Sequence, residues 1–205
     1  EPLDIPRYLG AVLLLLLLGP FLFLQHSLHR EVQAFFLLLT RRQDFSIIIF
    51  SLLFFPGVLL HETSHYLIAR LLNVRTGRFS LVPRPLPDGR LQLGFVETAQ
   101  TDFLRDALIG FAPLLFGGAF VIYAGLAHLE LDVLWQAWSN GSLEGFLQGL
   151  RQSYQSADFW LWFYLAFTIS STMLPSASDR KAWFPLASVL MGLFLLGVAA
   201  GAGPW

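Results

Sequence analysis

The hydrophobic residues of this chain are gathered into long runs separated by shorter polar stretches. Apolar runs of about twenty residues cover residues 8–24, 45–72, 107–127, 159–174 and 183–202. All of these except the second lack any Asp, Glu, Lys or Arg. A helical run of about twenty apolar residues matches the thickness of the hydrocarbon core of a bilayer. The pattern predicts an all-α polytopic membrane protein with about five transmembrane helices.

The segments between these runs show shorter patterns. Residues 26–42 place apolar side chains at helical spacing among charged ones, which predicts an interfacial amphipathic helix. Residues 78–82 and 90–97 alternate between apolar and polar positions, and the prolines and Asp88-Gly89 between them favour a turn. We therefore expect a small β-hairpin at the membrane surface. Residues 130–156 are amphipathic and loop-like, with tryptophans suited to the membrane interface.

These elements divide the chain into three expected parts. Residues 1–44 hold the first transmembrane helix and the interfacial helix, and residues 183–205 hold the C-terminal transmembrane helix. Residues 45–182 between them form the core. The first apolar run is not followed by a small-residue cleavage pattern, which favours a retained span over a signal peptide.

The distribution of arginine and lysine predicts how the chain crosses the membrane. The loop at 73–105 carries five arginines and the loop at 175–182 carries Arg180 and Lys181, whereas the loop at 128–158 carries Arg151 alone. Basic residues concentrate in short cytoplasmic loops. The N-terminus, the hairpin and the last loop are therefore expected in the cytoplasm, although Arg41 and Arg42 count against this orientation.

Composition narrows the chemistry. Hydrophobic residues make up 55% of the 205 residues and charged residues 13%, with a net charge of -1 and a mean hydropathy of +0.60. No cluster of lysines and arginines indicates a nucleic-acid partner, and no pattern indicates an oligomeric state. There are no cysteines, which excludes disulfides, thiolate metal sites and cysteine nucleophiles. Any metal ion must be held by His, Asp or Glu.

One apolar run is interrupted by the polar sequence His61-Glu62-Thr63-Ser64-His65. Polar groups inside a membrane span are costly unless they are paired. A spacing of four residues puts the two histidines on one helical face, about 40° apart, so that both can bind one metal ion. Glu62 lies about 100° round the helix, where it can hold a water molecule without being a ligand. This is the H-E-x-x-H arrangement of zinc hydrolases.

A catalytic zinc site normally needs a third protein ligand. At about 1.5 Å per residue, His65 lies about 30 Å along its span, and Asp179 lies about 30 Å along the fourth span, which runs in the same direction. Asp179 therefore reaches the membrane level of the histidines and is the favoured third ligand. Glu97, Asp102 and Asp106 lie on the same side of the membrane and remain alternatives.

These residues resemble the site-2 protease family of intramembrane zinc metalloproteases. Residues 65–80 are similar to the sequence that follows the zinc motif in that family, and Phe111-Ala112-Pro113 resembles its Ala-Gly-Pro element. Residues 173–179 are similar to its third-ligand segment, in which a proline precedes an aspartate. Two features differ: Ser and Thr stand at 170–172 where the family commonly has Asn, and Arg180 stands where it has Gly.

The resemblance covers most of residues 45–182 and implies a fold and an activity. It implies a three-helix catalytic core in which His61, His65 and Asp179 bind Zn²⁺ and Glu62 acts as general base. The substrate would be the transmembrane helix of another membrane protein, cleaved on the cytoplasmic side of the cell membrane. Such a helix must unwind before hydrolysis, and an edge of the hairpin offers a strand to hold it.

Two other functions compete with proteolysis. The first is a catalytically inactive, protease-like membrane scaffold or binding protein, which would have no chemical need for Glu62. The second is a metal or proton transporter, because ionisable residues inside a membrane mark transport pathways. The other apolar runs carry almost no ionisable groups, which disfavours transport.

Overall fold

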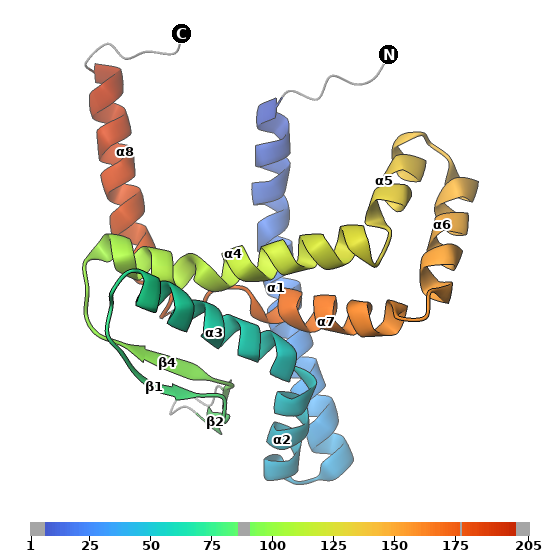
Figure 1. Ribbon diagram of the computed structural model, residues 1–205, viewed down its shortest axis with the longest axis horizontal. Helices are drawn as coiled ribbons and strands as arrows, with labels where there is room; N and C mark the ends of the chain where they lie inside the picture. Colours follow the sequence, from blue (N-terminus) through green and yellow to red (C-terminus); the bar gives the residue numbers. More distant parts are fainter. Residues whose placement is uncertain (1–6, 86–90, 177, 200–205) are drawn as a thin grey trace. The chain divides into compact units, whose positions relative to one another are not determined.

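In a computed structural model of the chain, residues 7–85, 91–176 and 178–199 are described. They are mostly helical, with a few short strands (Figure 1). In chain order the elements are α1 (Arg7–Thr40), α2 (Gln43–Leu53), α3 (Phe55–Leu71), β1 (Thr76–Ser80), β2 (Arg84–Pro85), β3 (Leu91–Gln92), β4 (Phe95–Thr98), α4 (Phe103–Ala127), α5 (Leu131–Ser139), α6 (Leu143–Gln155), α7 (Phe159–Thr172) and α8 (Trp183–Ala199).

The chain divides into two units, residues 1–52 and residues 53–205. In the first unit α1 runs without interruption through Pro20, so the interfacial helix expected over residues 26–42 is not a separate element. Residues 21–40 contain neither Gly nor Pro, so nothing in this stretch favours a break. Within this unit the Ser46 hydroxyl of α2 donates to the Gln33 carbonyl of α1 over 3.2 Å.

The run at 45–72 is broken near its middle, as the Pro56-Gly57 pair predicts. α2 ends at Leu53 and α3 begins at Phe55, which places Pro56 in the first turn of α3. Proline is favoured there because an N–H in the first turn has no partner within the helix. In the second unit the Tyr164 hydroxyl donates to the Leu53 carbonyl over 2.9 Å, which satisfies a backbone group exposed by the break.

Three helices of the second unit, α3, α4 and α7, pack against one another and form its core (Figure 1). The contact between α3 and α7 is close at Gly57, where an added Cβ would collide with the Thr168 carbonyl and the Thr172 hydroxyl. Ala69 of α3, Ile109 of α4 and nearby Val74 form a buried apolar cluster. The resemblance implies a catalytic core of three helices; α3, α4 and α7 do pack together, and their catalytic role stays a prediction.

The expected hairpin is present as two antiparallel strand pairs. β1 pairs with β4, with Phe79 opposite Val96 and Ser80 opposite Phe95. β2 pairs with β3 further along the same hairpin, and the turn expected at Asp88-Gly89 lies outside the described residues. Both β1 and β4 contact α3, so the hairpin lies against the helix that carries the two histidines.

The segment expected to be loop-like, residues 130–156, is instead helical. α5 and α6 pack against each other and connect α4 to α7 (Figure 1). The Ser142 hydroxyl caps α6 by accepting from the Gly145 N–H over 3.0 Å. The two tryptophans expected at the interface, Trp135 and Trp138, are exposed on α5. The sequence prediction was wrong because both helices are short and depend on packing against each other.

Length and composition mark α4 as a helix that can cross a membrane. Among the described residues, α2 and α3 together are also long and apolar enough to cross a membrane if the broken pair is counted as one span. α7 has only 14 residues and α8 has 17. The expectation of about five transmembrane helices therefore stays a prediction beyond this finding.

Candidate metal centre

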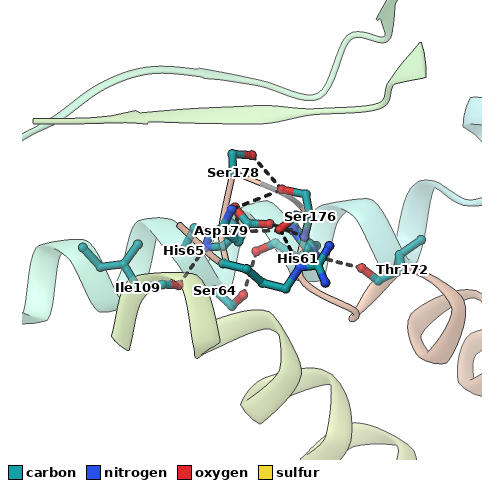
Figure 2. A network of polar contacts seen from close by, with 9 residues as sticks. His61, Ser64, His65, Ile109, Thr172, Ser176, Ser178 and Asp179 are labelled. Carbon is teal, nitrogen blue, oxygen red and sulfur yellow. Dashed lines mark hydrogen bonds and ion pairs between the residues drawn. The ribbon is translucent and has the colours of Figure 1, made fainter. Parts of the chain in front are cut away.

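The structure brings His61, His65 and Asp179 together (Figure 2). The two histidines lie one turn apart on the same face of α3, with their Nε2 atoms 3.1 Å apart. Asp179 comes from the loop between α7 and α8, and its Oδ1 lies 3.5 Å from His65 Nε2. Its Oδ2 lies 3.8 Å from His61 Nε2. The side chains of all three residues are largely shielded from solvent.

Each histidine ring is held from behind by a backbone carbonyl. Nδ1 of His61 lies 2.7 Å from the Thr172 oxygen at the end of α7, and Nδ1 of His65 lies 2.8 Å from the Ile109 oxygen of α4. A carbonyl oxygen can only accept, so Nδ1 of each ring is the donor. In the neutral ring Nε2 then keeps its lone pair. Both lone pairs are thus available on the side where Asp179 lies.

The donor atoms fit a metal ion. Two bare ring nitrogens 3.1 Å apart repel each other unless a cation or a proton lies between them, and a carboxylate beside them adds negative charge. Tetrahedral zinc with bonds of 2.0–2.2 Å requires donor atoms about 3.3–3.6 Å apart. His65 Nε2 lies close to that spacing from His61 Nε2, at 3.1 Å, and from Asp179 Oδ1, at 3.5 Å. One donor atom from each of the three residues lies within 4.8 Å of the other two. The group can therefore hold a metal ion.

The loop that carries Asp179 is shaped by its own serines. The Ser176 N–H donates to Asp179 Oδ2 over 2.7 Å, and the Asp179 N–H donates to Ser176 Oγ over 3.3 Å. The hydroxyls of Ser176 and Ser178 are 2.7 Å apart. On the other side, the loop packs on α4 at Gly110, where an added Cβ would collide with the Asp179 carbonyl oxygen. Hydrogen bonds within the loop and packing of the Asp179 backbone on α4 therefore both fix the position of the Asp179 carboxylate.

The same loop leaves the Thr172 carbonyl free to accept a hydrogen bond from His61. If α7 continued for one more turn, the Ser176 N–H would donate to the Thr172 carbonyl four residues earlier. The helix ends at Thr172, followed by Pro175, and the Ser176 N–H turns to Asp179. The Thr172 oxygen therefore accepts from His61. The end of α7 thus helps to position two candidate ligands, His61 and Asp179.

Glu62 is buried on α3 and is covered by the hairpin. A Cβ atom built on Gly94 would lie 2.8 Å from Glu62 Cγ and 3.1 Å from Glu62 Oε1. The same atom would lie 3.1 Å from the Ser80 carbonyl oxygen. The backbone between β3 and β4 therefore packs directly on the Glu62 side chain, at a position where only glycine fits without movement.

The alternative third ligands have other partners or positions. Glu97 forms a 2.7 Å ion pair with Arg78, and hydrogen bonds from Arg78 lower the pKa of Glu97. Asp102 caps α4 by accepting from the backbone N–H of Arg105, and that bond lowers the pKa of Asp102. Asp106 lies exposed in the first turn of α4. Of the four acids considered, Asp179 is the one placed beside the histidines.

Sequence reasoning missed the backbone groups of this centre. It identified neither the Ile109 carbonyl nor the Thr172 carbonyl, and it gave no role to Gly94. One signal was present: Pro113 deprives the Ile109 carbonyl of its helical donor, and Pro175 favours an end of the helix before it, which leaves the Thr172 carbonyl without one. Comparison of the chain with models of known protein families, with characterised proteins and with solved structures gives no match.

Proposed function

We propose that this protein is an intramembrane zinc metalloprotease of the site-2 protease type. The observation that carries the proposal is the meeting of His61, His65 and Asp179 at metal-binding distances, with Glu62 next to His61 on the same helix. The sequence resemblance to that family supports the same reading, because it names the same four residues.

Zinc at this centre would lower the pKa of a water molecule and polarise the carbonyl of the peptide bond to be cleaved. Glu62 would take the proton from the attacking water and pass it to the leaving amine. His61 and His65 would present Nε2 to the ion, and the carbonyls behind them would keep both rings in that orientation. Asp179 would supply the negative ligand.

The membrane arrangement is part of the same proposal. α1, the α2–α3 pair, α4, α7 and α8 would supply about five membrane crossings. The arginine-rich hairpin segment and the loop with Asp179 would face the cytoplasm. A non-helical loop at membrane depth is tolerated where protein buries it or water reaches it. The polar contacts of Ser176 and Asp179, together with the packing on Gly110, would satisfy part of the loop's backbone at that depth.

The proposed substrate is a transmembrane helix of another membrane protein. The backbone hydrogen bonds of a helix shield its peptide bonds, so the cleaved segment must be extended when it is hydrolysed. A two-stranded sheet formed by β1 and β4 leaves strand edges to which an extended segment can add. This sheet contacts α3, and the backbone beside it covers Glu62, so an added strand would lie near the reactive groups.

The decisive experiment separates metal binding from catalysis. We expect purified protein to contain one zinc ion per chain and to cleave tagged single-span test proteins in reconstituted vesicles. Glu62→Gln should retain zinc and lose cleavage by about 10²–10⁴-fold, because it removes the general base but no ligand. Glu144→Gln, which changes an exposed carboxylate on α6, is the matched control and should remain active.

Two outcomes would contradict the proposal. Full activity of Glu62→Gln would exclude the general-base role. Purified wild-type protein without zinc, even after incubation with zinc, would favour the scaffold alternative.

A further inference from the structure

Pro113 lies in the interior of α4 and its side chain is fully buried. A proline in the middle of a helix is destabilising, because it removes one hydrogen bond and clashes with the preceding turn. The carbonyl that loses its donor belongs to the residue four positions earlier. In α4 that residue is Ile109, whose oxygen accepts from His65 Nδ1 over 2.8 Å (Figure 2).

This coincidence has a chemical consequence for His65. An amide N–H at position 113 would compete for the Ile109 oxygen and draw it along the helix axis. A carbonyl oxygen can accept two hydrogen bonds, but without that N–H both of its lone pairs are free for a donor from a neighbouring helix. The bond it forms selects the ring tautomer with the proton on Nδ1, which leaves the Nε2 lone pair facing His61 and Asp179. Bonds of this kind also fix ring orientation at metal sites.

We propose that Pro113 is a positioning residue of the metal centre. Because it has no N–H, it leaves the Ile109 carbonyl to His65. It thereby sets the tautomer and the direction of the His65 ring, although the Ile109 carbonyl lies between the two residues. The inference rests on the metal centre of the proposed function, but it does not require that the protein cleave peptide bonds.

The test compares two replacements with the same side chain, one with and one without an N–H at position 113. Pro113→Ala restores the helical N–H. Replacement of residue 113 by lactic acid, introduced as an α-hydroxy acid, gives the same methyl side chain with an ester oxygen that cannot donate. Pro20→Ala restores an N–H in α1, which contributes no ligand, and serves as the control.

Two readouts are needed, and neither is activity. The first is the zinc dissociation constant, measured by competition with a chelating indicator. The second is the pair of ring ¹⁵N chemical shifts of His65 in metal-free, histidine-labelled protein, which report the tautomer. We expect Pro113→Ala to bind zinc about 10–100-fold more weakly, the range found when an outer partner of a histidine ligand is lost. Its His65 should show a mixture of tautomers.

The lactic acid replacement should stay within a few-fold of wild type in zinc affinity and keep the Nδ1–H tautomer. An equal loss in both replacements would overturn the inference, because Pro113 would then act through packing alone. Unchanged affinity and tautomer in Pro113→Ala would overturn it as well. Failure of the proposed function looks different: wild type would bind zinc and respond to these replacements, but would not cleave membrane substrates.

Discussion

At the scale of single residues, Gly94 controls how closely the hairpin lies against Glu62. The hairpin backbone occupies the space that a side chain at position 94 would need. A methyl group there must displace either the Glu62 carboxylate or the strand that covers it. Displacements of about 1 Å in reacting groups can reduce catalysis by about 10²-fold. The ligands themselves lie on other residues and do not depend on this contact.

We therefore predict that Gly94→Ala lowers kcat by at least about tenfold while the zinc content stays unchanged. Gly118→Ala is the matched control, because a Cβ at Gly118 meets nothing within 4 Å. Zinc content is measured on the purified proteins, and kcat on tagged single-span test proteins in vesicles. Equal kcat for the two variants would show that the hairpin yields to the methyl group and does not position Glu62.

At the scale of elements, the third ligand is decided by which segment reaches the histidines. Glu97 lies on β4, Asp106 lies in the first turn of α4, and Asp179 lies in the loop after α7. Extrapolating α7 as a helix placed Asp179 at the right level. In the structure α7 ends at Thr172, and a serine-rich turn brings the carboxylate to His65. Asp179 lies beside the histidines as expected, although a turn and not a continued helix positions it, and its role as a ligand stays a prediction.

This assignment predicts that Asp179→Ala binds zinc at least 100-fold more weakly, since it removes a direct ligand, whereas loss of an outer partner alone costs about 10–100-fold. Thermal unfolding with and without zinc provides the measurement. Zinc at 100 times its dissociation constant should stabilise the wild type by about 2.7 kcal/mol and leave Asp179→Ala almost unchanged. Asp106→Ala should behave as wild type. Retention of the zinc effect in Asp179→Ala would move the ligand to another acid.

At the scale of the whole molecule, α4 separates two groups of polar elements. The hairpin precedes α4 in the chain, and the α5–α6 pair follows it. Because α4 is long and apolar enough to span a membrane, these two groups are expected on opposite sides. The arginines of the hairpin segment predict that its side is the cytoplasm.

The absence of native cysteines makes this topology directly testable. Gln100→Cys precedes α4 and Gln136→Cys lies on α5, and both side chains are exposed. In intact cells a membrane-impermeant maleimide should label Gln136→Cys and spare Gln100→Cys. Inverted vesicles should give the opposite pattern. Labelling of both variants from the same side would show that α4 does not cross the membrane.

What the sequence determined by itself is local. Helical spacing placed His61 and His65 on one face, Pro56 predicted the break before α3, and alternation predicted the β1–β4 pairing, because each of these depends on residues close together in the chain. The tertiary structure decided the rest. His65 contacts a carbonyl 44 residues away and His61 one 111 residues away, and no local pattern records such partners. The candidate metal centre therefore depends on both: α3 supplies its two histidines, and the packing of α3, α4 and α7 supplies their orientation and the position of the candidate third ligand.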